Sequence, residues 1–194
     1  IDTSKLEVMR AAVAAGAGLI NDVYALRREG AMDAASSLGV PVILMHMQGE
    51  PRTMQNAPHY NDIAAEVRSF LADRLLACEL AGIPKAKVIL DPGFGFGKNF
   101  ELLARLTELS SLNVPILAAL SRKRMIGEVT GRDVHERVAG SVAGHLLAVE
   151  RGAMLVRVHD VAPMRDALAV WQATKAFIRT SKPMASHPRW FDEE

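Results

Sequence analysis

The stretch Ala86–Lys98 reads AKVILDPGFGFGK and joins a short apolar run to a turn that contains three glycines. The apolar run does not alternate between polar and apolar residues, which is typical of a strand buried on both faces of a parallel sheet. The turn fits neither the Walker phosphate loop nor the dinucleotide fingerprint, because Asn99 follows Lys98 and one residue separates the last two glycines. The glycines therefore indicate a tight exit from the strand, and Asp91 is the residue beside them that offers chemistry.

Similar apolar runs recur along the chain and predict four more strands: Ala17–Val23, Pro41–Met47, Pro115–Lys123 and Ala153–Val161. Helical patterns lie around and between them: Lys5–Ala14, Ala31–Ser37, Asp62–Ala81, Phe100–Leu109, Val134–Glu150 and Ala162–Ile178. The third of these helices has Asn61 at the expected N-cap and Gly82 just past its end. Strands that alternate with helices predict an α/β fold with a parallel sheet and helical crossovers.

Polar residues follow nearly every predicted strand: Asp2, Asn21, Asp22, His46, Asp91, Ser121, Arg122, Lys123, Arg157, His159 and Asp160. A TIM (β/α)8 barrel gathers the carboxyl ends of all its strands around one mouth, whereas an open sheet concentrates them at a switch point. We therefore predict a TIM (β/α)8 barrel, of which this chain covers about the end of strand 3 through helix 8. A complete barrel has about 250 residues, so its first strands would precede this chain.

The bulk composition excludes several classes of partner. The net charge is +1, which gives no electrostatic reason to expect nucleic acid or an anionic membrane as a partner. The longest apolar run, Val138–Val149, is interrupted by Ser141 and His145 and is too short to span a membrane. The single Cys78 excludes an internal disulfide and suits a reducing compartment, so we expect a cytoplasmic protein.

The polar strand ends divide by chemistry into two groups. Asp2, Asn21 and Asp91 supply hydrogen-bond acceptors, and a carboxylate suits the paired N–H groups of an aminopyrimidinone or guanidine-like edge. The donors Ser121, Lys123, Arg157 and His159 suit the oxygens of a phosphate. Together they predict a site for a flat polar heterocycle with an anion at one end.

Structural interpretations of the same residues remain open. Asp22 is also suited to capping a helix, His46 to a satisfied place in the core, and Arg122 and Asp160 to an ordinary ion pair. The whole constellation also fits an ion-pair network that stabilises the rim of a barrel.

Six segments together resemble the dihydropteroate synthase family, in the same chain order: IDTSK, LINDV, LMHMQGEPRTMQ, LDPGFGFGKN, LSRKRMIG and VRVHDV. The resemblance runs from Asp2 to about Lys175 and is closest to bacterial members. It implies a pterin-binding TIM barrel domain over residues 1–180, followed by a tail over residues 181–194. It also implies condensation of 6-hydroxymethyl-7,8-dihydropterin diphosphate with 4-aminobenzoate, which gives 7,8-dihydropteroate and diphosphate in folate biosynthesis. Sulfonamides inhibit this family, and the resemblance implies a homodimer through the last helices.

The resemblance assigns roles to individual residues. It implies pterin binding by Asp2, Asn21, Met45, Asp91 and Lys123, with Asp91 and Lys123 as the catalytic pair. It further implies diphosphate binding by Asn21, Arg157 and His159, and aminobenzoate binding by Phe96, Ser121 and Lys123. The expected cofactor is Mg²⁺, whose Asn ligand would lie upstream of this chain, so the chain itself is expected to contain no metal ligand. The implied mechanism is an ionisation, in which diphosphate leaves before the amine attacks.

Three departures from the family pattern are visible. The first two strands are absent, the connection after Asn99 is short, and Arg124 follows Lys123 where relatives often have a small Ser. Two other functions remain as alternatives: a methyltetrahydrofolate-type pterin methyltransferase and a non-catalytic pterin-binding paralogue. A methyltransferase has no diphosphate to hold, so the SRK and RVHD segments argue against it.

Overall fold

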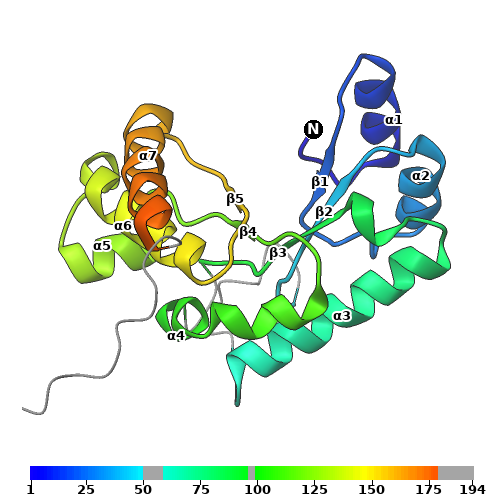
Figure 1. Cartoon of the computed structure of the whole chain (residues 1–194). Coiled ribbons are helices and arrows are strands. Elements are labelled where there is room, and N and C mark those ends of the chain that lie inside the picture. Colours follow the sequence, from blue (N-terminus) through cyan, green and yellow to red (C-terminus); the bar gives the residue numbers. More distant parts are fainter. Residues whose placement is uncertain (50–58, 96–98, 179–194) are drawn as a thin grey trace, which may run out of the picture.

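The computed structural model describes residues 1–49, 59–95 and 99–178 (Figure 1). The described residues contain a parallel sheet of three strands, β1 (Ile20–Asp22), β2 (Val42–Met45) and β3 (Val88–Asp91), in that order. Two more parallel strands, β4 (Leu117–Ala118) and β5 (Leu155–Val156), form a pair. A bridge between Leu90 and Ile116 places β4 beside β3, and a bridge between Asp2 and Asn21 places the start of the chain beside β1. Parallel neighbours in chain order confirm the predicted α/β fold.

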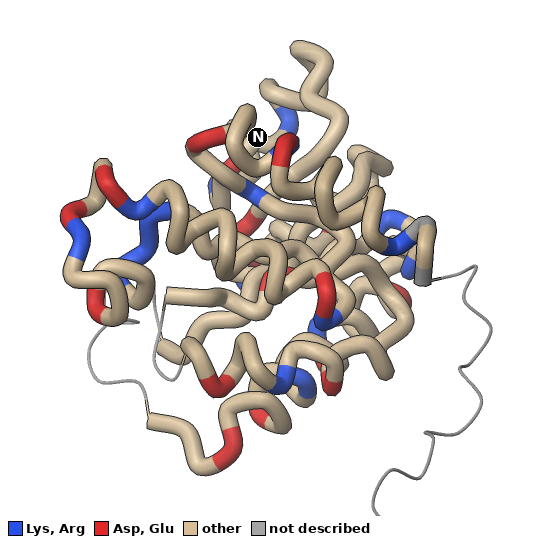
Figure 2. Tube along the Cα trace, turned by 60° about the vertical axis from the view of Figure 1, so that its left-hand side comes forward, with Lys and Arg blue, Asp and Glu red and all other residues tan. Residues whose placement is uncertain are grey.

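Helices connect successive strands, and in Figure 1 they lie around the outside of the strands. Their bounds are α1 (Leu6–Ala14), α2 (Ala31–Leu38), α3 (Ile63–Leu80), α4 (Asn99–Ala104), α5 (Arg124–Thr130), α6 (Val138–Glu150) and α7 (Val161–Ile178). Short 3-10 helices cover Lys85–Lys87, Leu106–Leu112 and Val134–Glu136. Basic and acidic residues both occur along the described trace, as expected from a net charge of +1 (Figure 2). None of the described helices combines the length and the apolarity needed to cross a bilayer.

The core lies between the strands and helix α3. The apolar residues Ile63, Val67, Phe70, Leu71, Leu75 and Cys78 recur at helical spacing along α3; all are buried except Phe70, which is partly buried. They join a cluster that includes Leu44 of β2 and Leu90 of β3, both fully buried. Because these strands are covered on both faces, they contain no alternating pattern.

Several local predictions need correction. The N-cap of α3 is Asp62 rather than Asn61, because the Asp62 carboxylate accepts a hydrogen bond from the Ala65 amide at 3.0 Å. The strands are shorter than predicted. In particular, the predicted strand Pro115–Lys123 contains the two-residue strand β4, because its last residues turn away from the sheet and Arg122 has a φ of 57°. The prediction also missed α5.

Candidate functional site

The carboxyl ends of β1, β3 and β5 meet at one place. The Arg157 guanidinium donates to Asn21 Oδ1 at 3.1 Å and to Asp91 Oδ2 at 3.3 Å. Asn21 lies on β1 and Arg157 follows β5, which are at opposite ends of the described strand order. The strands must therefore curve to bring β5 towards β1. Two of the three residues predicted as acceptors, Asn21 and Asp91, and one predicted donor, Arg157, are therefore neighbours in the folded chain.

The glycine turn after β3 holds Asp91 in place. The Gly93 amide donates to Asp91 Oδ1 at 2.8 Å, and the His46 amide donates to the Asp91 carbonyl at 2.9 Å. Gly93 has a φ of +78°, and a Cβ there would collide with the His46 carbonyl oxygen. Only glycine has both the required backbone freedom and the small size for this position. The turn therefore presents the carboxylate of Asp91.

Asp91 is 1% exposed, and burial raises the pKa of its carboxyl group. The Gly93 amide, Lys123 and Arg157 oppose this effect because each stabilises the charged form, whereas the negative charge of Asp2 adds to it. Asp2 forms a bridge with Asn21, which places it beside the same site. A buried carboxylate with cationic neighbours is suited to binding a polar heterocycle or stabilising positive charge on it.

Lys123 approaches the same glycine turn from the end of β4. Its ammonium group donates to the Phe94 carbonyl, and a Cβ at Gly95 would lie 3.1 Å from the Lys123 Nζ atom. Burial lowers the pKa of Lys123, and the nearby Asp91 carboxylate opposes this effect. Lys123 and Asp91 are thus an electrostatically coupled pair from adjacent strands.

The remaining predicted donors form a pocket of about 240 Å³ at the ends of β4 and β5. Ser121 Oγ accepts the His159 amide at 3.1 Å and lies 2.8 Å from His159 Nδ1. The residues that line the pocket are Ala119, Ser121, Lys123, Arg157, Val158 and His159. Its polar lining contains two cationic side chains, an imidazole and a hydroxyl group, which are suited to an anionic ligand.

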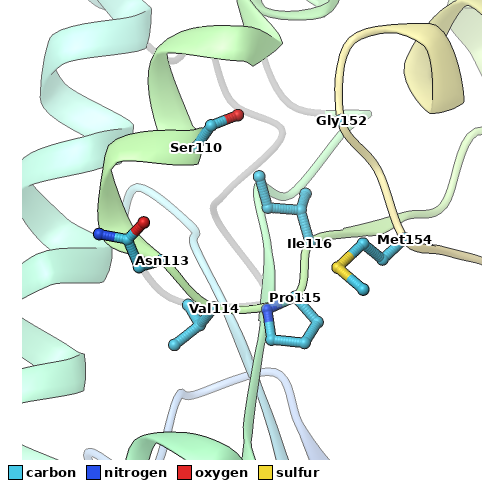
Figure 3. A pocket seen from close by; sticks show the side chains of 7 residues that line it. All are labelled: Ser110, Asn113, Val114, Pro115, Ile116, Gly152 and Met154. Atoms are coloured by element: carbon cyan, nitrogen blue, oxygen red, sulfur yellow. The ribbon is translucent and has the colours of Figure 1, made fainter.

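A larger cavity of about 430 Å³ lies at the opposite, amino-terminal ends of β4 and β5 (Figure 3). Its lining residues are Ser110, Asn113, Val114, Pro115, Ile116, Gly152 and Met154. None of the described residues in its lining is ionisable, so they offer little of the chemistry found at the carboxyl ends.

Some strand-end residues have structural roles, as the alternative interpretations allowed. Asp22 is fully buried and accepts hydrogen bonds from Ser4 Oγ, the Tyr24 amide and the Leu26 amide, so it stabilises the turn after β1. Arg122 donates two hydrogen bonds to Asp160, at 2.6 and 3.0 Å.

His46 is buried, and its ring lies edge-on to Phe70 with 5.0 Å between the ring centroids. Burial lowers the pKa of His46 to about 4. Met45 pairs in register with Asp91, and Phe96 lies outside the described residues.

Two residues to which the sequence assigned no role contact the turn after β4. Ser141 and His145 of α6 bond to backbone amides of this turn. The available signal was a pair of polar residues, four positions apart, within an otherwise apolar helix.

The described residues contain no group of three or more His, Cys, Asp or Glu side chains that fits a metal ion. They therefore do not by themselves account for the expected Mg²⁺.

Comparison with known proteins identifies the family. The family model of pterin-binding enzymes matches residues 1–159. This chain belongs to the pterin-binding enzyme family. It is 48% identical to the dihydropteroate synthase of Escherichia coli (strain K12) over 178 residues, which cover 90% of this chain and 63% of that enzyme.

Two solved structures resemble this chain closely. Dihydropteroate synthase from Stenotrophomonas maltophilia, with imidazole in its active site, has a TM-score of 0.88 and 63% identity. This match covers 91% of this chain and 68% of that structure. The Xanthomonas albilineans enzyme in complex with 7,8-dihydropteroate has a TM-score of 0.84 and 61% identity, with coverages of 90% and 66%. The family resemblance stated from the sequence is therefore confirmed.

Proposed function

We propose that the protein containing this chain is a dihydropteroate synthase. It would condense 6-hydroxymethyl-7,8-dihydropterin diphosphate with 4-aminobenzoate and release 7,8-dihydropteroate and diphosphate. The observation that carries the proposal is the meeting of Asn21, Asp91, Lys123 and Arg157 at the carboxyl ends of four strands. Support comes from Xanthomonas albilineans dihydropteroate synthase, whose structures contain 4-aminobenzoic acid or 7,8-dihydropteroate.

In this proposal the pterin occupies the acceptor side of the site. Its polar edge donates to Asp91 and Asn21, both at least nine-tenths buried, while Asp2 and Lys123 complete the polar contacts and Met45 packs on the ring. Arg157 donates to the same acceptor oxygens of Asn21 and Asp91, so its guanidinium lies beside the proposed pterin position. From there it would bind the diphosphate together with His159 and the Asn21 amide.

The proposed reaction begins with cleavage of the bond between the pterin methylene carbon and the diphosphate oxygen. The electron pair leaves with diphosphate, and Arg157 stabilises the developing negative charge. The carboxylate of Asp91 stabilises the pterin-methylene cation. The amine of 4-aminobenzoate then forms the new carbon–nitrogen bond and loses a proton. Apolar walls around the site would exclude water, which otherwise competes with the amine for the cation.

We assign the aminobenzoate side to Ser121, Phe96 and the aliphatic stem of Lys123. Ser121 is 7% exposed and faces the pocket beside His159. Sulfonamides would compete for this side of the site. A sulfonamide drug complex is known for the Yersinia pestis dihydropteroate synthase, which is 44% identical to this chain.

We further propose that residues 1–180 form the barrel domain from about the end of strand 3 through helix 8, followed by a tail over residues 181–194. Three observations support additional strands upstream. The chain spans 63% of the Escherichia coli enzyme. Among the described residues, β5 pairs with β4 and with no other strand. The adjacent apolar residues Met154 and Leu155 are 74% and 36% exposed, which is unfavourable unless another segment covers them.

The proposal also includes Mg²⁺, a homodimer and a cytoplasmic location. A Mg²⁺ ion would neutralise charge on the diphosphate, but it would need ligands beyond the described residues, and the roles given above do not depend on it. Leu147 of α6 and Val170 and Phe177 of α7 are 42%, 67% and 76% exposed, which supports burial of these helices against a second copy. Cys78 is free and buried, as suits a reducing compartment.

The test is an assay for 7,8-dihydropteroate with the protein at the full length that its gene encodes. We expect product from the two substrates and none when 4-aminobenzoate is left out. Methyl transfer from methyltetrahydrofolate would instead assign the protein to the methyltransferases, and pterin binding without turnover would assign it to the non-catalytic paralogues. Ile1–Glu194 assayed alone should aggregate and give no product. A soluble and active Ile1–Glu194 would contradict the proposed upstream strands.

A further inference from the structure

The turn after β4 carries two residues of the candidate site and has an unusual backbone. Ser121 and Lys123 line the pocket, and Arg122 lies between them with a φ of 57°. This left-handed conformation costs roughly 1–2 kcal/mol for a residue with a Cβ. It persists only where the surrounding structure holds it. The positions of Ser121 and Lys123 therefore depend on what holds this turn.

Helix α6 supplies several of the groups that hold it, in addition to the bonds of Arg122 to Asp160 and of the His159 amide to Ser121 Oγ. His145 is fully buried, and its Nε2 atom accepts the Leu120 amide at 3.1 Å. One helical turn earlier, Ser141 Oγ accepts the Arg122 amide at 2.9 Å. Arg137, at the start of the same helix, donates to the Arg122 carbonyl at 3.1 Å. Three side chains of one helix face thus bond to the backbone of Leu120 and Arg122.

The partners of His145 determine its protonation. Its Nδ1 atom lies 2.7 Å from the Ser141 carbonyl, which only accepts, so Nδ1 carries the proton. Its Nε2 atom receives the Leu120 N–H and must be unprotonated. The ring is therefore neutral, and it links the backbone of α6 to the backbone of the turn. Without this ring the buried Leu120 amide would lose its acceptor, which is unfavourable.

We propose that His145 and Ser141 are positioning residues for the reaction, because they fix the Leu120–Lys123 turn and thereby place Ser121 and Lys123 in the pocket. The effect on catalysis rests on the proposed function, whereas the effect on the turn does not. Neither residue touches the pocket, so each acts through the backbone. The proposal also explains why an apolar helix contains these two polar residues on one face.

The experiment compares four variants of the protein at its full encoded length. His145→Ala removes the acceptor from the Leu120 amide, and Ser141→Ala removes the acceptor from the Arg122 amide. His145→Gln is the conservative variant, because its amide group has a donor and an acceptor at a spacing close to that of the two ring nitrogens. Leu146→Ala is the matched control, since Leu146 is a half-buried neighbour on α6 with no hydrogen bond from its side chain to the turn.

Two readouts separate positioning from loss of stability. We expect the Leu120 amide of His145→Ala to exchange with solvent at least about tenfold faster, because it has lost its buried partner. We also expect the KM for 4-aminobenzoate to rise about tenfold, a quantity that does not depend on how much of the protein is folded. His145→Gln should restore most of both values. Loss of folded protein alone lowers the apparent kcat and leaves KM unchanged, and this is the result expected for Leu146→Ala.

Several outcomes would overturn the proposal. One is a His145→Ala variant whose KM matches that of Leu146→Ala, and another is a folded His145→Gln variant as impaired as His145→Ala. If His145→Ala does not fold, Ser141→Ala decides the question. Alanine is a good helix former, so this variant should fold. It should raise both the KM for 4-aminobenzoate and the exchange rate of the Arg122 amide. Absence of dihydropteroate from the wild-type protein would refute the proposed function. The amide exchange rates would still test whether His145 and Ser141 fix the Leu120–Lys123 turn.

Discussion

The two sides of the candidate site differ in how firmly the fold holds them. The acceptor side, defined by Asp2, Asn21 and Asp91, lies at the start of the chain and at the ends of β1 and β3. Asn21 and Asp91 are at least nine-tenths buried, whereas Asp2 is exposed. The donor side, defined by Ser121, Lys123, Arg157 and His159, follows two strands of two residues each, and the Arg157 side chain is 46% exposed.

This difference in burial agrees with the proposed role of each side, which is pterin binding for the acceptor side and diphosphate binding for the donor side. A buried acceptor side is organised before the ligand arrives and keeps its hydrogen-bond geometry through the reaction. A donor side with a half-exposed arginine can follow an anion as it separates from the pterin. The acceptor side should therefore respond to substitution through stability and pterin affinity, and the donor side through anion affinity.

The largest effect is expected from Gly93→Ala, on the acceptor side. The new Cβ would collide with the His46 carbonyl while the backbone is held at a φ of +78°. Overpacking and the left-handed conformation together should lower the free energy of unfolding by about 2–5 kcal/mol. Gly131→Ala is the control, because Gly131 has a φ of +67° and no atom lies within 4 Å of the position that a Cβ would take there. Urea unfolding measures both, and equal losses would show that Gly93 does not need the close approach.

The second prediction concerns the charge at Asp91. Asp91→Asn keeps the shape of the side chain but replaces an acceptor oxygen with a donor group, which then faces a donor of the pterin. We expect a loss of roughly 2–4 kcal/mol in binding of 6-hydroxymethyl-7,8-dihydropterin. Calorimetry measures this affinity, with Asp166→Asn as the control for removing an exposed carboxylate. A folded Asp91→Asn variant with unchanged affinity would remove Asp91 from the pterin site.

The third prediction concerns His46 and pH. Burial lowers the pKa of His46 to about 4 from its usual value of 6.5, so the unfolded chain takes up a proton before the folded chain does. The contribution of neutral His46 to the free energy of unfolding is therefore complete above pH 6.5. It declines as the pH falls towards 4 and does not change further below that. At 1.36 kcal/mol per pH unit, the decline amounts to about 3 kcal/mol.

Removing the ring tests this assignment. His46→Gln should flatten the pH dependence of the free energy of unfolding between pH 6.5 and 4, measured against the wild type by urea titration. The buried His145, whose pKa is also lowered by burial, contributes in the same direction and remains in both proteins. An unchanged slope in His46→Gln would mean that His46 titrates in the folded protein as it does in the unfolded chain.

The sequence predicted the elements of the acceptor side well, because buried parallel strands leave a simple apolar signal. The run before Asp91 and the glycines after it were sufficient to predict a tight strand exit that presents a carboxylate. The donor side was less predictable. Its strands are short, α5 begins at once after Lys123, and the left-handed conformation of Arg122 has no sequence signal because the residue is not glycine.

Contacts between distant segments set the remaining limit on what can be predicted from the sequence. The bond from Arg157 to Asn21 joins residues 136 positions apart and depends on the curvature of the strands. The bond from the Leu120 amide to His145 joins residues 25 positions apart and depends on how α6 lies against β4. Local patterns indicate that such residues are polar and where their elements begin, but the pairing follows from tertiary packing.

The smallest of these effects is expected from Arg157→Ala, on the donor side. Loss of a charged hydrogen-bond donor should weaken binding of diphosphate and of the diphosphate-bearing pterin by about ten- to a hundredfold. Binding of the bare 6-hydroxymethyl-7,8-dihydropterin should not weaken, because in the proposed site Arg157 contacts the diphosphate and not the heterocycle.

Isothermal titration with the three ligands measures this difference, with Arg165→Ala as the control for removing a nearby exposed cation on α7. A variant that loses affinity equally for the bare pterin and for its diphosphate would show that Arg157 supports the whole pocket. The contrast between a fixed acceptor side and an adjustable donor side would then be wrong. Selective loss of anion binding would instead show that the two sides recognise separate parts of one substrate, which is what a reaction with a departing diphosphate requires.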